Sequence, residues 1–383
     1  MKRVVLSILL GCILLTSAAN AAPRWSVEKA NQWYSRQPWL VGANFIPSTA
    51  INQLEMWQAE TFDPVTIDRE LGYGEKIGMN TMRVFLHNLP YEQDAAGYTQ
   101  RIEEYLTIAD RHHIKTIFVL FDSCWNDNPK LGEQPAPKPG IHNSGWVRAP
   151  GTKRLFDSRT WDGLEKYTTN ILKTFGSDPR VLAWDLFNEP SNSGYLDAAV
   201  PLLRATFIWA RAANPQQPLT VGYWNDHPLS NQVISDNSDV VTFHNYDTAD
   251  KLEAQIGELQ KMQRPLICTE YMARTRGSLF ETSLPVFKKY RVGAINWGLV
   301  KGKTNTIFAW DKPMPNVAEP AVWFHDIFRP DGTVFSQQEI DFIKRSLSNL
   351  SAGYDRPFPD RPRRSNPVVM GRHSQSLTRH TSQ

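Results

Sequence analysis

The sequence predicts an α/β fold, a (β/α)8 barrel that forms a single catalytic domain. Eight short apolar segments of strand character alternate with segments of helical periodicity. This alternation calls for parallel strands joined by right-handed crossovers. The segment Lys115–Phe121 (KTIFVLF) is apolar almost throughout, as expected for a strand buried on both faces. Eight such units in roughly 310 residues favour a closed TIM barrel.

An open, doubly wound sheet is the alternative architecture. The sequence contains neither the G-x-G-x-x-G nor the P-loop motif that would support it. The chain has 383 residues, of which 41% are apolar, and this is enough for one large core. Because barrels of this length commonly form one domain, residues 22–350 are assigned to a single catalytic domain.

Local signals fix the predicted strands. Gly42 allows the first strand to pack closely, and Pro190 ends the fourth because proline cannot donate to a sheet ladder. The eight expected strands are Trp39–Phe45, Asn80–Leu86, Lys115–Phe121, Val181–Phe187, Leu219–Tyr223, Val240–Phe243, Pro265–Cys268 and Gly293–Trp297.

Helices are predicted from apolar residues at helical spacing. Ile67, Leu71 and Ile77 follow this spacing in the second helix, and Gly78 ends it. Ser26 is a residue type favoured at the start of a helix. The expected helices are Ser26–Arg36, Pro64–Ile77, Tyr98–His112, Trp161–Phe175, Gly194–Ala213, Asp250–Met262, Leu279–Tyr290 and Gln337–Leu347.

The two ends of the chain differ from the predicted barrel. A basic start at 2–3, an apolar run at 4–15 and an A-x-A site at 19–21 predict a signal peptide over residues 1–21 and a secreted or periplasmic protein. Lipoprotein anchoring through Cys12 is the less favoured alternative, because the apolar run continues beyond it. Residues 351–383 hold six arginines and two aspartates, and we expect a basic, disordered tail there.

Composition narrows the classes of partner. A net charge of +3 argues against nucleic acid, and beyond the N-terminus no stretch is long enough to span a membrane. Cys124 and Cys268 remain after cleavage, which is no disulfide framework; one bridge is the alternative, and we expect free buried thiols. Thirteen tryptophans favour a flat ligand for part of the surface, although core packing accounts for many of them. We expect a monomer.

Polar residues at the carboxyl ends of the strands are the candidate site, because active sites of such barrels lie there. Two carboxylates stand out, Glu189 after the fourth strand and Glu270 after the seventh, which face each other across the mouth of an eight-stranded ring. The set is Asn44, Arg83, His87, Asp122, Asn188, Glu189, Trp224, His244, Tyr246, Glu270 and Trp297.

Paired carboxylates are what glycoside hydrolysis requires, one to protonate the leaving oxygen and one to attack carbon or activate water. Arg83 is expected to keep Glu270 ionised by lowering its pKa, while desolvation raises that of Glu189. Strict alternation places Asn188 and Glu189 on opposite faces of the strand, so both reach the site only if the strand bends.

Each of these residues also has a purely structural interpretation. Arg83 is equally suited to a structural ion pair, His244 to a core position and Trp297 to plugging the barrel. Their shared position at one end of different strands favours a site. The sequence has no H-E-x-x-H motif and no compact His/Asp/Cys spacing, so we expect neither a metal nor another cofactor.

The arrangement resembles clan A of the glycoside hydrolases, and family 5, the cellulase and mannanase family, in particular. The resemblance rests on the N-E-P motif at 188–190, a Glu after strand seven, an Arg in strand two, His-x-Tyr after strand six and a Trp after strand eight. It implies retaining hydrolysis with Glu189 as acid/base and Glu270 as nucleophile. The implied supporting residues are Arg83, Asn188, His244 and Tyr246, and Trp297 is the implied sugar-stacking residue.

One departure from the family affects the substrate. The family commonly has a His at the end of strand three, where this chain runs Phe121-Asp122-Ser123-Cys124-Trp125. His87 is a candidate to fill part of that space. Tryptophans expected at the mouth, as sugar platforms or as packing residues, are Trp57, Trp125, Trp146, Trp224 and Trp310.

The predicted activity is hydrolysis of β-glycosidic bonds in a β-linked oligo- or polysaccharide, by an endo-β-glucanase- or mannanase-like enzyme or by an exo-β-glycosidase. Long loops at 46–63, 124–155 and 301–321 suit an open cleft or a closed pocket, and the sequence does not choose between them. A carbohydrate-binding barrel without activity and a transglycosylase are the alternatives.

Overall fold

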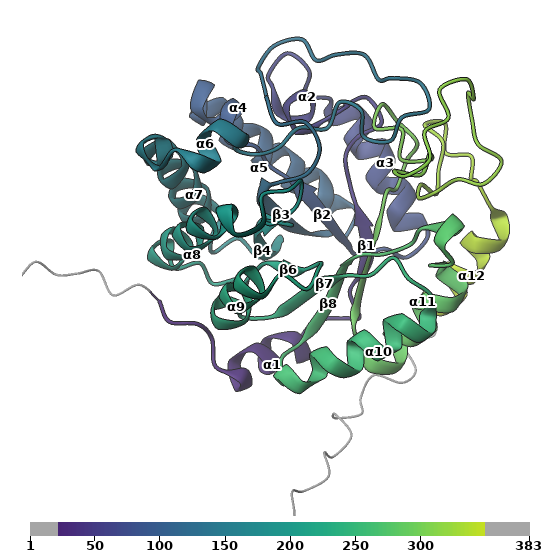
Figure 1. The fold of residues 1–383 in the computed structure, drawn as a ribbon. Coiled ribbons are helices and arrows are strands. Elements are labelled where there is room, and N and C mark those ends of the chain that lie inside the picture. The colour runs from purple at the N-terminus through teal and green to yellow at the C-terminus, as the bar shows by residue number, and fades with distance from the viewer. Residues whose placement is uncertain (1–21, 349–383) are drawn as a thin grey trace, which may run out of the picture.

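The structure is a computed structural model that describes residues 22–348. Its strands form one sheet in which every pair is parallel, surrounded by helices (Figure 1). The expected signal peptide and tail lie outside the described residues. The strands are β1 (Val41–Asn44), β2 (Thr81–Phe85), β3 (Lys115–Asp122), β4 (Val181–Asn188), β5 (Leu219–Thr220), β6 (Gly222–Tyr223), β7 (Val241–His244), β8 (Leu266–Glu270) and β9 (Gly293–Trp297).

The strand order confirms the predicted barrel. The sheet runs β5-β4-β3-β2-β1-β9-β8-β7-β6, so the ring is complete except between β5 and β6. These two strands correspond to the single predicted fifth strand, which is interrupted at Val221. The amide of Val221 donates to the Oγ of Ser238 at 3.3 Å. The expected strand Leu219–Tyr223 is therefore present as two short pieces.

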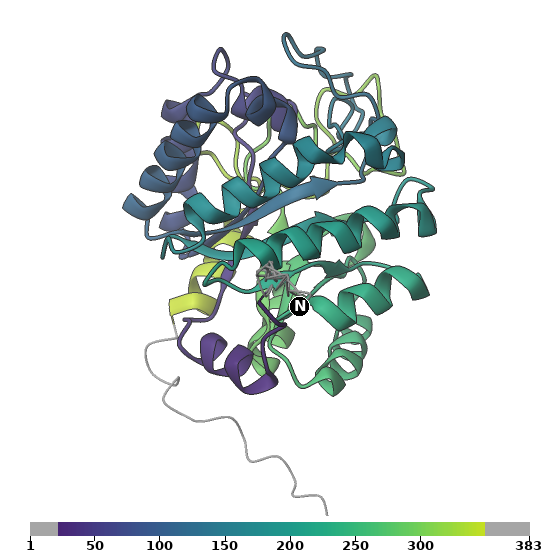
Figure 2. The ribbon, with the colours of Figure 1, turned by 90° about the vertical axis from the view of Figure 1, so that its left-hand side faces the viewer.

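Helices cover the outside of the ring, and α7 and α8 lie side by side along one flank (Figure 2). The prediction missed the short helices α2, α4 and α6 and also α9, which fills the crossover between β6 and β7. The helices are α1 (Val27–Ser35), α2 (Gln53–Trp57), α3 (Pro64–Lys76), α4 (Asn88–Gln93), α5 (Ala95–Arg111), α6 (Thr152–Phe156), α7 (Trp161–Phe175), α8 (Val200–Ala213), α9 (Pro228–Asn237), α10 (Ala249–Leu259), α11 (Phe280–Tyr290) and α12 (Gln337–Ser348).

The core has two layers, because strand residues alternate between the two faces of the sheet. The larger layer lies between the strands and the helices. A smaller cluster combines alternate strand residues such as Ile117, Ala183 and Ile295 with Tyr34 of α1. Helix α1 therefore closes the amino-terminal end of the barrel, and the opposite end is left for the site.

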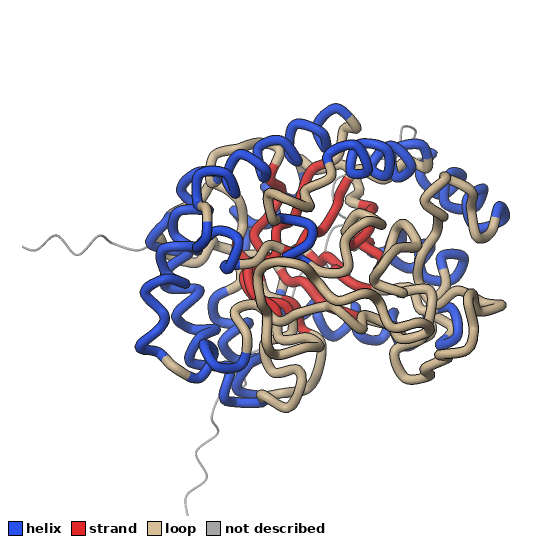
Figure 3. Tube along the Cα trace, turned by 90° about the horizontal axis from the view of Figure 1, so that it is seen from above, coloured by secondary structure: helices blue, strands red, loops and turns tan. Residues whose placement is uncertain are grey.

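Three long loops gather on one side of the mouth (Figure 3). We call them the β1 loop (residues 45–63), the β3 loop (123–151) and the β9 loop (298–336). Trp57, predicted at the mouth, is instead fully buried in the core. It packs against Tyr98 and Tyr105, and its indole donates to the carbonyl of Phe85. A large apolar ring gains more from burial than from exposure in a loop.

Two further features concern membrane spans and disulfide bonds. No helix in the described part of the chain is both long and apolar enough to cross a membrane. Cys124 and Cys268 are free thiols, as expected.

Arg274 holds the β9 loop to α12. Its guanidinium pairs with Glu339 at 2.7 Å and donates to the carbonyls of Trp323, His325 and Asp326. Its side chain is 4% exposed. Loss of one partner of a buried ion pair leaves the other charge and its acceptors unpaired, which is costly.

We predict that Arg274→Ala lowers the free energy of unfolding by about 3–5 kcal/mol, measured by chemical denaturation. The matched control is Arg276→Ala, because Arg276 pairs with Asp311 while 43% exposed and should cost less than about 1 kcal/mol. Equal effects of the two changes would contradict this account of the loop.

Candidate active site

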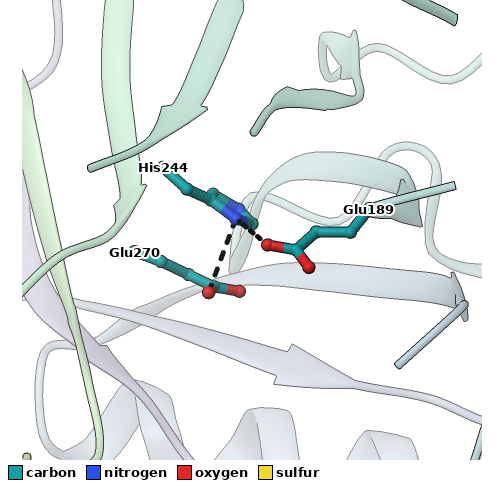
Figure 4. Close-up of side chains that lie close together, drawn as sticks. All are labelled: Glu189, His244 and Glu270. Atoms are coloured by element: carbon teal, nitrogen blue, oxygen red, sulfur yellow. Dashed lines mark hydrogen bonds and ion pairs between the residues drawn. The ribbon is translucent and has the colours of Figure 1, made fainter. Parts of the chain in front are cut away.

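The two predicted carboxylates meet at the carboxyl end of the barrel. Glu189 follows β4 and Glu270 ends β8, and both line a cavity of about 940 Å³. Figure 4 shows them on either side of His244, which ends β7. One oxygen of each carboxylate and one ring nitrogen of His244 all lie within 4.8 Å of one another.

The backbone of Glu189 explains how neighbouring residues both reach the site. Strand β4 ends at Asn188, and Glu189 has a φ of 45°, in the left-handed region that residues other than glycine rarely adopt. The turn at this residue brings its side chain to the same cavity as that of Asn188. Such a conformation costs of order 1–3 kcal/mol and persists only where the surrounding structure enforces it.

Arg83 is the centre of the polar network beneath the cavity. Its guanidinium is fully buried and pairs with Glu270 at 2.8 Å and with Asp185 at 2.8 Å. It also donates to the side-chain oxygens of Asn44 and Asn188, at 2.9 and 2.7 Å. Burial alone would lower the pKa of Arg83, but the two carboxylates outweigh it and raise that pKa. Arg83 therefore stays charged.

Glu270 receives three polar contacts. In addition to its ion pair with Arg83, it accepts a hydrogen bond at Oε2 from the hydroxyl of Tyr246 at 2.8 Å. His244 Nδ1 lies 3.4 Å from the same oxygen. We expected Arg83 to lower the pKa of this carboxyl. Burial has the larger effect and raises the pKa, while His244, Arg83 and Tyr246 oppose the rise. The predicted ion pair is present, but the predicted direction of the shift was wrong because desolvation was underestimated.

Glu189 lies in a different environment and makes no ion pair with Arg83. Its Oε1 contacts His244 Nδ1 at 2.7 Å, and its Oε2 accepts from the thiol of Cys124 at 3.3 Å and from the amide of Asn192. Burial raises the pKa of Glu189, opposed by Asn192 and Cys124. A carboxyl with a raised pKa is suited to donate a proton.

His244 lies between the two acids and is neutral near pH 7. Burial lowers its pKa to about 4, although Glu270 opposes this. Its Nδ1 contacts both carboxylates, and its Nε2 has no hydrogen-bond partner among the described residues. The imidazole therefore places no positive charge between the two acids near pH 7.

The structure places the other predicted residues in two groups. Five predicted tryptophans line the cavity, whereas Asn44 lies below it and is held by Arg83 and two backbone carbonyls. Trp146 is fixed by a bond of 2.6 Å from its indole to Asp122. The lining tryptophans are Trp125, Trp146, Trp224, Trp297 and Trp310.

His87 does not have the predicted position. It is fully buried and does not contribute to the cavity. Its Nδ1 accepts from the amide of Leu89 at the start of α4, and its Nε2 contacts the carbonyl of Arg148 at 3.0 Å. The expectation of a sugar contact is corrected, because local backbone groups occupy both nitrogens.

Several residues of the site were not predicted. Asp185 neutralises Arg83, and its presence in the apolar run VLAWDLFN is a signal, because a buried charge requires a partner. Asn192 follows the N-E-P motif closely. His142 and His325 line the cavity from the β3 and β9 loops, and nothing in the sequence pattern identified them because only loop packing brings them in.

A metal could also be held here. Glu189, His244 and Glu270 together offer two carboxylate oxygens and one imidazole nitrogen within 4.8 Å, a donor set that several divalent metals accept. In the described structure His244 Nδ1 already shares a hydrogen bond with Glu189, and it lies 3.4 Å from Glu270. The expectation that no metal is required stays a prediction.

Solved structures with the same fold support the architecture. A variant of GH5_18 from Streptomyces cattleya in complex with Manβ1-4GlcNAc is 13% identical, covers 85% of this chain and 83% of its own, and gives a TM-score of 0.57. The endo-β-1,4-mannanase from Thermotoga petrophila is 14% identical, with coverages of 84% and 79% and a TM-score of 0.56. At these identities the similarity establishes the fold.

A third similar structure is the exo-β-1,4-mannosidase Op5Man5 from Opitutaceae bacterium strain TAV5. It is 16% identical, with coverages of 81% of this chain and 60% of its own and a TM-score of 0.54. No curated protein sequence matches the chain significantly.

The sequence profile of the family described as Cellulase (glycosyl hydrolase family 5) matches residues 74–307. That span runs from the end of α3 to the β9 loop and includes both carboxylates. The chain therefore belongs to glycosyl hydrolase family 5 and is a glycoside hydrolase, as the residues at its strand ends predicted.

Proposed function

We propose that this protein is a retaining β-glycosidase in which Glu270 is the nucleophile and Glu189 the acid/base. The supporting observation is the pair of opposed carboxylates, with an oxygen of each within 4.8 Å of the other. Retaining enzymes keep their carboxyl groups about 5–5.5 Å apart, whereas inverting enzymes need about 6.5–9.5 Å to admit a water molecule. The close approach favours direct attack on the sugar.

The unequal surroundings of the two acids support the assignment of roles. Glu270 is paired with Arg83 and accepts from Tyr246, which stabilises the negative charge that a nucleophile requires. Glu189 has no arginine ion-pair partner. Burial raises the pKa of both carboxyls, so the difference in partners, and not the direction of the shift, supports the division of roles. Two carboxyls with different environments are how such sites divide the acid and nucleophile roles.

In the proposed first step, a Glu270 oxygen forms a bond to the anomeric carbon while the bond from that carbon to the glycosidic oxygen breaks. Glu189 gives its proton to the departing oxygen. In the second step, Glu189 removes a proton from water as that water attacks the anomeric carbon, and Glu270 leaves as a carboxylate. Atoms and charge balance, and no cofactor takes part.

We propose β-1,4-linked mannosides as the first substrates to test. The similar structures with TM-scores above 0.5 include an endo-β-1,4-mannanase, an exo-β-1,4-mannosidase and a complex with Manβ1-4GlcNAc. Asn188 and Trp297 line the cavity and are proposed to contact the sugar. We also propose that the protein is exported from the cytoplasm. A mature protein whose amino-terminal sequence begins at Ala22 would support this.

Glu270→Gln is predicted to lower kcat by at least about 10³-fold on every substrate, since a neutral amide cannot form the covalent intermediate. Glu189→Gln is predicted to lose far more activity on a natural disaccharide than on a dinitrophenyl glycoside, whose leaving group needs no proton. Steady-state kinetics on both substrates test this, with the exposed Glu258→Gln as control. Equal losses on both substrates in Glu189→Gln would remove it as the acid.

The stereochemistry of the first product tests retention. We expect the β anomer to appear first and then to equilibrate, because two displacements at the same carbon restore its configuration. Proton NMR during the first minutes of hydrolysis measures this. Initial formation of the α anomer would exclude the covalent mechanism while leaving hydrolysis itself intact.

Cys124→Ala is predicted to move the basic limb of the pH profile of kcat/KM to higher pH. The thiol donates to Glu189 and thereby lowers the pKa of that carboxyl, so its removal raises the pKa and keeps the acid protonated further into the basic range. Cys124→Ser retains a donor and should hold the limb near the wild-type position. A shift toward lower pH in Cys124→Ala would contradict the assignment.

A further inference from the structure

We propose that the cavity is blind on the side of Glu270, so that the enzyme removes one sugar at a time from the non-reducing end of its substrate. This inference rests on the proposed function and names its mode of action. It follows from a wall that the β1, β3 and β9 loops build across one end of the cavity.

The three loops are joined to one another by hydrogen bonds. The amide of Asn143 in the β3 loop donates to the carbonyl of Thr304 in the β9 loop at 2.8 Å. Asn52 in the β1 loop donates to the carbonyl of Gly145 in the β3 loop at 2.8 Å. Lys303 in the β9 loop pairs with Glu55 of α2 at 2.5 Å. Each loop thus contacts both others, and the wall is continuous.

A glycine marks the contact between the β3 and β9 loops. Gly140 has a φ of 66°, and a Cβ at this position would lie 2.0 Å from the carbonyl oxygen of Met314. The amide of Met314 donates to the carbonyl of Gly140 at 3.0 Å. Only a residue without a side chain permits this approach.

The wall ends the cavity rather than dividing it. Asn143, Trp146 and Trp297 line the main cavity on one side and a second void on the other, and that void measures about 20 Å³. About 10–15 Å³ of such space holds one water molecule, so the void admits a water molecule but no sugar ring. A sugar chain therefore has no path through this part of the described structure.

Two buried histidines, His142 and His325, line the inner face of the wall. Their Nδ1 atoms contact the carbonyls of Phe308 and Met272 at 2.8 and 2.5 Å. A carbonyl only accepts, so each Nδ1 carries the proton and each Nε2 is an acceptor. The Nε2 of His325 is buried without a partner among the described residues, in a side chain that lines the cavity.

The wall lies one side chain away from the proposed nucleophile. Trp310 packs edge-on against Tyr246 with ring centroids 4.9 Å apart, and His325 lies 5.6 Å from the same ring. Tyr246 in turn donates to Glu270. Residues of the wall therefore bound the space over Glu270, and in the proposed mode of action this space holds a single ring.

The opposite side of the cavity faces solvent. There Glu189 contacts Asn192. The lining continues to Ser193, Asp226 and Lys251, and these three residues are exposed. The acid protonates the leaving group, so the leaving sugars lie on its side, and the sugar that bonds to the nucleophile lies on the other. The blind side thus receives the non-reducing end, and chains of any length extend past Glu189.

The test uses β-1,4-linked tetra- and pentasaccharides of mannose and of glucose, labelled at the reducing end, with products separated at early times. We expect unlabelled monosaccharide and a labelled product that is one sugar shorter. Labelled mono- or disaccharide among the first products would overturn the blind end while hydrolysis, and hence the proposed function, still stands. Absence of cleavage across a broad panel of β-glycans would remove the proposed function itself.

Two glycine variants in the β3 loop test whether the wall is the cause of this cleavage pattern. Gly140→Ala should displace the β9 loop and raise the fraction of internal cleavage several-fold. Gly132→Ala is the matched control, because Gly132 also has a positive φ but a Cβ there meets nothing within 4 Å, and its products should match the wild type. If Gly140→Ala fails to fold by circular dichroism, Trp310→Ala replaces it. Unchanged products from folded Gly140→Ala or Trp310→Ala would overturn the role of the wall.

Discussion

The buried guanidinium of Arg83 is the interaction on which the rest of the site depends. It is fully enclosed, and an isolated charge there would be very costly, so Asp185 and Glu270 must both be present to pair with it. The same group orients Asn44 and Asn188. One cation thereby fixes residues from β1, β4 and β8, and the geometry of the cavity floor follows from satisfying its five donors.

The acid and nucleophile roles proposed above this floor depend on the fact that Arg83 pairs with Glu270 but not with Glu189. Arg83 makes no ion pair with Glu189, which is supported instead by His244, Cys124 and Asn192. Burial therefore acts on two acids that differ in their partners, and the difference in partners, rather than a difference in burial, separates their roles. The neutral imidazole of His244 links them without reducing that difference.

Sequence patterns were sufficient for the barrel and for the residues at its strand ends, because apolar runs and their terminating residues are local signals. The strand-end rule brought Glu189, His244, Tyr246 and Glu270 together correctly. It failed for residues whose position depends on tertiary packing. Nothing local distinguishes the buried Trp57 from a tryptophan at the mouth, and His142 and His325 enter the cavity only because distant loops meet.

The interruption at Val221 leaves one open seam in the barrel, between β5 and β6. Strands β3 and β4 are joined by six registered residue pairs, whereas β5 and β6 contribute two each to their neighbours. A ring with so few bonds at one seam yields there first, because local opening follows the weakest backbone bonding. The seam lies next to Trp224, on the side of the departing sugars. In the proposed binding mode, the weakest seam of the barrel thus faces the product that must leave, and the continuous part of the sheet holds the sugar that reacts.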